Sequence, residues 1–156
     1  MGTRQLRRFV IQSTARDYYF VYRRNRLEDS GKPIGREVFA MVYRKKDAVL
    51  IEKYGVRMRI YNSSEDCPQA AVAYQETEKG HAEEFIHHKS AFIYYILEGK
   101  GTWVIEGKEY DAEAGDVVIV PPGKKIYFKG KLKQICITAP AWEEASEEHV
   151  RYIEDL

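Results

Sequence analysis

The segment at residues 80–123, GHAEEFIHHKSAFIYYILEGKGTWVIEGKEYDAEAGDVVIVPPG, determines the fold that we expect for this chain. It contains three apolar runs, at residues 91–97, 102–105 and 117–120, which are separated by short segments that contain glycine. The last run ends at Pro121-Pro122-Gly123. Short β-prone runs bounded by glycine and proline are typical of consecutive antiparallel strands joined by tight turns. This segment therefore predicts an antiparallel β-sheet.

Further β-prone segments lie on both sides of this one. Residues 56–61 alternate three apolar side chains with two arginines and a tyrosine, which predicts a strand with one buried face. The other expected strands are residues 7–12, 17–24, 37–43, 48–52, 70–76, 125–129 and 132–138. At most one short helix is expected, beginning near Trp142 or Ser146, and residues 149–153 are either a last strand or a frayed helix end. This pattern predicts an all-β barrel or sandwich.

The composition fits one soluble domain, because 156 residues can bury a core of their own. No apolar run reaches the roughly 20 residues that span a bilayer. The N-terminus lacks the apolar core of a secretory signal, so we expect a cytoplasmic protein. Neither Cys67 nor Cys136 has the spacing of a metal-ligand or disulfide framework.

The spacing of glycine and proline resembles that of the cupin family, over about residues 70–138. The first cupin motif is a Gly, five residues, His-x-His, three or four residues, Glu, six residues and Gly, and its glycines match Gly80 and Gly99. The second is Gly, five residues, Pro-x-Gly, two residues, His, three residues and Asn, and it matches Gly115, Pro121 and Gly123. The resemblance implies a cupin-type double-stranded β-helix, the jelly-roll barrel.

The resemblance also implies how a single domain of residues 1–156 is organised. We expect an N-terminal β-strand extension at residues 1–62, the cupin barrel at residues 63–140 and a C-terminal tail at residues 141–156.

The metal-binding positions of the two motifs are largely replaced. Cupins with a metal bind it through the two His and the Glu of the first motif and the His of the second. In this chain the motifs place Ile86, His88, Phe92 and Ile126 at those positions. Because catalytic metal sites use about three protein ligands, one imidazole cannot hold a divalent ion. We therefore expect no metal and no cofactor.

The two adjacent histidines leave alternatives open. A shift of one residue would make His87 the motif histidine, but neighbours on a strand point to opposite faces, so only one can enter the barrel. We expect His88 in the barrel and His87 at the surface. Glu84 lies on the face of His88 at period two, with His81 and Glu76 as possible neighbours, and provides a weak alternative metal site.

The barrel interior is the expected ligand site. Counting at period two from the motif positions gives His88, Phe92, Tyr94, Ile126 and Phe128 as lining residues. Aromatic walls with a few polar groups are typical of a small-molecule site, and we predict a small organic ligand, with a carbohydrate-type molecule as one candidate. Core packing that fills the barrel is the alternative. The phase of three further candidates is not fixed by the sequence: Tyr74, Glu76 and Trp103.

An enzymatic alternative follows from the resemblance. Metal-free cupins include sugar-nucleotide epimerases and ketoisomerases that use a His base and a Tyr acid. Here His88 could be the base and Tyr94, or Tyr74, the acid, since histidine titrates near neutral pH.

The charge distribution offers a third function class. Residues 1–60 contain 15 Lys or Arg and 6 Asp or Glu, whereas the rest contains 10 and 18. A basic face with interleaved tyrosines could bind a nucleic acid or another polyanion. Its members would be Arg7, Arg8, Arg23, Arg24, Arg26, Lys45, Lys46, Arg57 and Arg59, with Tyr18, Tyr19 and Tyr22. No nucleic-acid motif supports this alternative.

We also predict a homodimer. Family members often pair through N-terminal strands, and the edge strand expected at residues 17–24 needs a covering partner.

Overall fold

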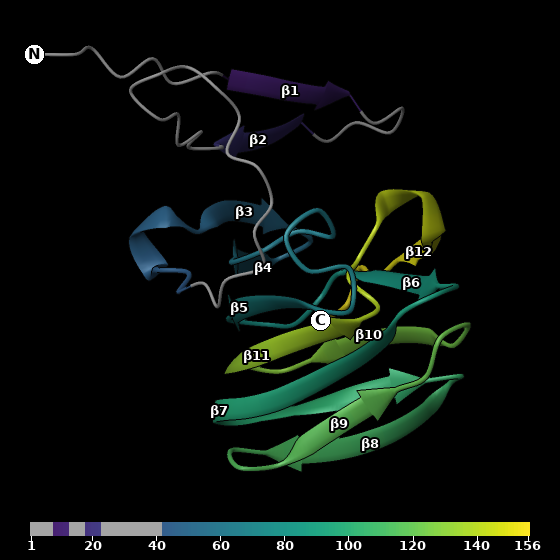
Figure 1. The fold of residues 1–156 in the computed structure, drawn as a ribbon. Coiled ribbons are helices and arrows are strands. Elements are labelled where there is room, and N and C mark those ends of the chain that lie inside the picture. Colours follow the sequence, from purple (N-terminus) through teal and green to yellow (C-terminus); the bar gives the residue numbers. More distant parts are fainter. Residues whose placement is uncertain (1–7, 13–17, 23–41) are drawn as a thin grey trace, which may run out of the picture.

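The computed structural model describes residues 8–12, 18–22 and 42–156, and it describes side chains from residue 42 onward (Figure 1). Strands β1 (Arg8–Gln12) and β2 (Tyr18–Tyr22) form an antiparallel hairpin. The strand expected at residues 37–43 falls mostly outside the described residues, and Val42 and Tyr43 do not belong to a strand.

Apart from two short 3-10 turns, the regular structure of residues 42–156 is all strand, which confirms the all-β prediction. A three-residue 3-10 turn, Lys45–Asp47, precedes the main sheet, and a second, Glu144–Ser146, precedes its last strand. The strands are β3 (Val49–Lys53), β4 (Val56–Ile60), β5 (Ala71–Thr77), β6 (Glu83–His87), β7 (Ala91–Ile105), β8 (Lys108–Glu113), β9 (Val117–Val120), β10 (Lys125–Lys129), β11 (Leu132–Ala139) and β12 (Glu147–Tyr152).

Strand β7 connects the two halves of the barrel. The strand order is β12-β6-β10-β7-β11-β5-β4-β3, and β8 and β9 also pair with β7. The first half of β7 lies between β9 and β11, whereas its second half lies between β8 and β10. This curled antiparallel arrangement is visible in Figure 1 and confirms the jelly-roll prediction.

Alternation along the strands produces the core. On β11, for example, Leu132, Gln134, Cys136 and Thr138 are buried, and the residues between them are half-buried on the outer face. The central cluster is aromatic and aliphatic. Its members are Val56, Phe85, Phe92, Tyr94, Ile96, Trp103, Val120, Ile126, Phe128, Leu132 and Cys136.

Two motif glycines are required by close backbone approach. Gly80 has a φ of +126°, and a Cβ there would lie 2.2 Å from the carbonyl oxygen of Phe128. Gly99 has a φ of +82°, and a Cβ there would lie 2.2 Å from the carbonyl oxygen of Lys131. Both positions exclude an L side chain, on conformational and on steric grounds.

The C-terminal segment is more extended than expected. The helix considered near residues 142–148 is only the 3-10 turn, and β12 begins directly after it. β12 pairs antiparallel with β6, with His149 opposite Phe85. No helix in residues 42–156 or in the described part of the N-terminal segment is long and apolar enough to cross a membrane.

Candidate functional site

The histidine that enters the barrel is His87. Its exposed fraction is 3%, and its ring lies 5.6 Å from that of Phe92. His88 lies on the outer face with 54% of its side chain exposed, and its Nε2 lies 2.7 Å from Glu148 Oε2. The expectation that His88 faces the interior is therefore wrong, because the motif frame is shifted by one residue on β6.

His87 has a structural role. The amide of Ser90 donates a hydrogen bond of 2.9 Å to its Nδ1, which makes Nδ1 the acceptor. Its Nε2 then carries the proton and donates to the carbonyl oxygen of Glu143 at 3.1 Å. Both ring nitrogens are occupied, so this histidine connects the end of β6 to the segment before β12.

The two glutamates of β6 are held by β12. Arg151 donates from Nε to Glu84 Oε2 at 2.7 Å, and His149 donates from Nδ1 to Glu83 Oε1 at 2.7 Å. Burial raises the pKa of Glu83, and the hydrogen bond from His149 partly offsets that effect. Glu84 is thus committed to an ion pair, away from His88.

The described residues do not fit the metal ion of other cupins. Phe85 and His87 are the inward residues of β6, and Phe92 and Ile126 are the inward residues at the other two motif positions. No group of three His, Cys, Asp or Glu side chains in the described part of the chain could hold a metal ion. The Glu84 and His88 alternative fails this test as well.

Most of the predicted lining does face the interior. Phe92, Tyr94, Ile126 and Phe128 are buried, as expected from the period-two count, and so is Trp103, whose phase the sequence did not fix. Their rings contact one another, with Tyr94 and Phe128 at 5.8 Å between centroids. Whether these residues touch a ligand stays a prediction.

Tyr74 and Glu76 face outward. On β5 the buried residues are Ala73, Gln75 and Thr77. The hydroxyl of Tyr74 donates to Glu76 Oε2 at 3.0 Å on the outer face. The polar groups that this strand places in the interior are therefore the amide of Gln75 and the hydroxyl of Thr77.

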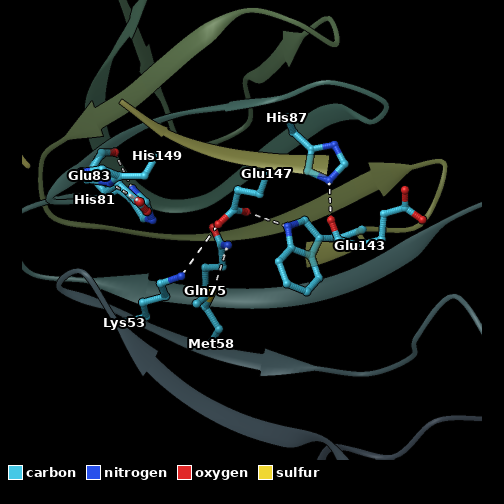
Figure 2. A network of polar contacts seen from close by, with 10 residues as sticks. Lys53, Met58, Gln75, His81, Glu83, His87, Glu143, Glu147 and His149 are labelled. Atoms are coloured by element: carbon cyan, nitrogen blue, oxygen red, sulfur yellow. Dashed lines mark hydrogen bonds and ion pairs between the residues drawn. The ribbon is translucent and has the colours of Figure 1, made fainter. Parts of the chain in front are cut away.

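A group of charged and aromatic side chains closes one mouth of the barrel. Lys53 Nζ on β3 lies 3.8 Å from Glu147 Oε1 on β12, and the indole Nε1 of Trp142 donates to Glu147 Oε2 at 2.7 Å. The side chains of Lys53 and Glu147 are only 23% and 20% exposed. Figure 2 shows Lys53, Gln75 and Glu147 pointing toward one another from three different strands.

His81 lies beside this group in an aromatic cage. Its ring contacts the rings of Tyr54, Phe85 and Phe128 at 5.4, 5.2 and 5.8 Å. Its Nδ1 donates to the carbonyl oxygen of Glu83 at 2.8 Å (Figure 2). Burial lowers the pKa of His81, the hydrogen bond to Glu83 raises it and the charge of Lys53 lowers it, and together they bring the pKa to about 4. His81 is therefore neutral near pH 7, with Nε2 as its basic nitrogen.

Tyr94 places a phenol close to His81, since the rings of both contact Phe128. Burial raises its pKa well above the usual value, and the nearby Cys136 and Glu147 raise it further. The Tyr94 hydroxyl therefore keeps its proton at neutral pH and can donate a hydrogen bond.

Amides line the interior below the mouth. Gln134 Nε2 donates to Gln75 Oε1 at 2.8 Å, and Gln75 Nε2 lies 3.4 Å from the sulfur of Met58. Gln134 Oε1 and Trp103 Nε1 are buried, and neither has a hydrogen-bond partner among the described residues. Buried polar groups without partners are uncommon and costly, so the interior has unused capacity for polar recognition.

We name Lys53, His81, Tyr94, Trp142 and Glu147 the mouth cluster. It combines a cation, a neutral base, a phenol and a carboxylate with aromatic walls. Such a set can hydrogen-bond several hydroxyl groups of one ring while a flat group stacks on aromatic side chains.

The sequence did not reveal most of the mouth cluster. Only Tyr94 was expected as a lining residue, and His81 was considered only as a neighbour of a metal site. Lys53 and Glu147 come together because β3 and β12 meet across the mouth, which no local pattern indicates. The one available signal was the position of His81 directly after the motif glycine Gly80.

Comparisons with known proteins agree with the fold. The cupin domain model matches residues 73–131. An uncharacterised protein of Methanocaldococcus jannaschii is 33% identical over 66 residues, which are 40% of this chain and 53% of that protein. The chain thus matches about half the length of this archaeal relative.

Solved structures extend the likeness beyond the motifs. A variant of PAC13 from Streptomyces, solved with uridine, is 30% identical with a TM-score of 0.71, over 75% of this chain and 95% of that chain. Pac13 is described as a nucleoside dehydratase. KdgF from a Halomonas species has a TM-score of 0.58 over 69% of this chain and 99% of its own, and at 13% identity it shares the fold alone.

Proposed function

Because the chain belongs to the cupin superfamily, we propose that it binds a small molecule of nucleoside or sugar type at the mouth cluster, without a bound metal ion. One observation carries this proposal. The Lys53–Glu147 ion pair, the Trp142 indole and neutral His81 gather at one mouth of an aromatic-lined barrel. Uridine in the PAC13 structure supports the ligand class, since that protein is similar over 95% of its length.

Each group has a distinct part in binding. The carboxylate of Glu147 accepts hydrogen bonds from ring hydroxyls, as sugar sites commonly require, and Lys53 donates to a ring or carbonyl oxygen. The half-exposed indole of Trp142 offers a face for stacking, and its N–H fixes the rotamer of Glu147. Inside the barrel, Gln134 Oε1 is available to a ligand N–H.

A second candidate function is proton transfer on the bound sugar. Neutral His81 favours it, because Nδ1 is held by the Glu83 carbonyl and Nε2 can accept a proton. In an isomerisation, Nε2 would take a proton from one carbon and return it to a neighbouring atom. In a dehydration, the neighbouring hydroxyl would leave as water with a proton from Tyr94 or Lys53. His81 thus replaces His88 as the proposed base, and Tyr94 stays the proposed acid.

Titration calorimetry with uridine, uracil and ribose tests the binding proposal. We expect uridine to bind the wild-type chain and to change the fluorescence of Trp142. Glu147→Gln should weaken binding by about 10- to 100-fold, the usual loss for a hydrogen bond to a charged group. The matched control is Glu109→Gln. Glu109 on β8 is an exposed carboxylate that pairs with Lys129 on β10, and this variant should bind uridine like the wild type.

Two results would reject this proposal. One is the absence of binding for all three probes at millimolar concentration. The other is an equal loss of affinity in Glu147→Gln and Glu109→Gln. For proton transfer, His81→Gln should retain uridine binding and abolish solvent-deuterium incorporation or product formation, if the wild type shows either.

Other expectations keep the status of proposals. Elemental analysis tests the metal-free state, which one equivalent of Fe, Mn, Ni or Zn per chain would contradict. A cytoplasmic location and a homodimer are also proposed.

For the polyanion alternative, most of the basic residues lie outside the described side chains. Of the others, Arg57 lies 3.6 Å from Glu76, and Arg59 covers the ring of Tyr74.

A further inference from the structure

The two halves of the barrel have edge strands on two sides. One half has the strand order β12-β6-β10-β7-β8 and the other has the order β3-β4-β5-β11-β7-β9, because β7 belongs to both. On one side, the edge strands β3 and β12 are joined by the Lys53–Glu147 ion pair. On the other side, β8 and β9 line a groove of about 650 Å³, which we name the β8–β9 groove (Figure 1).

The backbone of β9 is paired along one edge only. The register with β7, together with the hydrogen bond from the amide of Ile96 to the carbonyl oxygen of Asp116, places Val118 in a hydrogen-bonded pair. Because such pairs alternate, the N–H and C=O groups of Val117 and Ile119 point away from β7. Strand β9 has no other partner among the described strands. Its free edge therefore presents hydrogen-bond donors and acceptors at the β8–β9 groove.

This edge of β9 lacks the usual protection against strand pairing. Natural proteins commonly protect edge strands with charged side chains or with a covering segment. The sequence of β8, KEYDAE, contains four charged residues, whereas that of β9, VVIV, contains none. Val117 and Ile119 are also 53% and 61% exposed. Strand β9 is therefore suited to pairing with a further strand.

The floor of the β8–β9 groove is apolar. Ile105, Ala112 and Val118 line it and pack against the central cluster of the barrel. Tyr110 on β8 is a further lining residue and is 49% exposed. An extended segment beside β9 would direct every second side chain toward this floor.

The two ends of the β8–β9 groove differ in charge. Asp111, in the second half of β8, and Asp116, in the turn that follows, make the end near this turn negative. Lys108 begins β8 and Lys124 follows β9, and both lysines are exposed at the opposite end. Glu106 also lines that end, and its Oε1 accepts a hydrogen bond from the following strand β10. With two cations and one carboxylate, that end is positive.

We propose that the β8–β9 groove binds an extended peptide segment of a partner protein, which pairs antiparallel with β9. Addition of a strand to an exposed sheet edge is a known mode of peptide recognition, in which main-chain hydrogen bonds provide affinity and alternate side chains provide specificity. The charges define the class of peptide. Carboxylates near its N-terminus lie beside Lys108 and Lys124, and cations near its C-terminus lie beside Asp116. The residues between them are β-prone, with alternate apolar side chains on the floor.

A single strand suits this groove better than the edge of a folded second copy. In a second copy the free edge of β9 also faces its own β8 across the same groove. A folded edge would bring that strand with it, whereas an isolated strand enters alone. The groove lies on the side of the barrel away from the Lys53–Glu147 pair, so this proposal does not depend on the ligand of the mouth cluster.

Fluorescence anisotropy of the full chain with the labelled nonapeptide EEVTVTVKK tests strand addition. We expect binding in which the valines face the floor, so the threonine N–H groups face β9, because opposite residues of an antiparallel pair share a face. N-methylation of the two threonines should therefore weaken binding by at least about 10-fold. The matched control is the peptide with two N-methylated valines, whose N–H groups face away from β9, and it should bind like the unmethylated peptide.

The double variant Lys108→Glu/Lys124→Glu tests the charge assignment. It should bind EEVTVTVKK about 10-fold more weakly, the combined effect of two partly exposed ion pairs, and it should bind KKVTVTVKK more tightly than the wild type does. The matched control is Lys45→Glu/Lys79→Glu. This variant makes the same change of charge at exposed lysines outside the groove, and it should bind EEVTVTVKK like the wild type.

Circular dichroism and the melting temperature establish that each variant is folded. A wild type that binds neither peptide at millimolar concentration would overturn the proposal. Equal binding of the two N-methylated peptides would do the same, as would an equal loss of affinity in the two lysine variants. If sedimentation shows that peptide binds only when a dimer dissociates, the groove belongs to a second copy instead.

Discussion

Lys53 Nζ on β3 lies 3.8 Å from Glu147 Oε1 on β12, and these two strands are the opposite ends of the strand order β12 to β3. The ion pair therefore joins the two ends of the sheet across the mouth of the barrel. Each partner comes from an end strand, so neither position is fixed by the central core alone.

We expect Glu147→Gln to change stability little. The pair is partly exposed and its atoms are 3.8 Å apart, so its loss should cost less than about 1 kcal/mol. The Gln carbonyl can still accept the Trp142 hydrogen bond. Urea unfolding measures the difference, and a loss of several kcal/mol would mean that the ion pair is mainly structural.

His81 should make stability depend on pH. Its folded pKa of about 4 lies below the ordinary value of 6.5, so the unfolded chain binds the proton more tightly. The contribution of His81 to the free energy of unfolding is therefore complete above pH 6.5. It falls by about 3 kcal/mol in total as the pH decreases toward 4.

Urea unfolding between pH 4 and 7 should therefore show a weaker pH dependence in His81→Asn than in the wild type. The comparison is needed because Glu83, whose pKa is raised by burial, acts in the opposite direction. Parallel curves for the two proteins would contradict the assignment of a buried neutral His81.

Two turn glycines, one of them a motif glycine, allow a matched pair of substitutions. Gly99 and Gly107 have similar φ values, +82° and +77°, but only at Gly99 would a Cβ meet backbone atoms within 4 Å. Gly107→Ala should cost about 1 kcal/mol from conformational strain. Gly99→Ala adds a clash with Lys131 and should cost at least about 3 kcal/mol. Equal losses in urea unfolding would show that strain, not contact, dominates at both sites.

The two thiols should differ in reactivity. Burial raises the pKa of Cys136 to about 12, so the native protein holds almost no thiolate there. Cys67 lies in a surface turn with partial exposure. Ellman's reagent should therefore modify one thiol per native chain quickly and the second only in urea. The Cys67→Ser variant should show no fast reaction, and rapid modification of Cys136 would indicate an opening barrel.

Much of the fold could be predicted because its determinants are local. Turn glycines, the Pro121-Pro122-Gly123 end and the apolar runs act within a few residues, and they predicted β3, β4, β5, β9, β10 and β11. The runs at residues 91–97 and 102–105 were expected as two strands, but they form the single strand β7, and β8 was not expected. The inward positions of Phe92, Tyr94 and Phe128 followed from alternation, because the residues next to them on each strand point to the outer face.

The phase of β6 could not be predicted because its burial depends on a distant strand. Glu83 and Glu84 are both buried, since β12 provides His149 and Arg151 as their partners. The sequence EEFIHH therefore has no readable alternation. On β5, Gln75 is inward because Gln134 satisfies its amide, although Tyr74 is the more apolar neighbour.

Strand β7 also has a kinetic consequence. Its 15 residues share backbone hydrogen bonds with β8, β9, β10 and β11, so no one of these strands can detach it from the rest. A local opening exposes the amides of a strand only when the backbone hydrogen bonds to its neighbouring strands are broken. The amide protons of β7 should therefore exchange with solvent only through global unfolding. We expect the amides of this strand to be the slowest to exchange in the molecule.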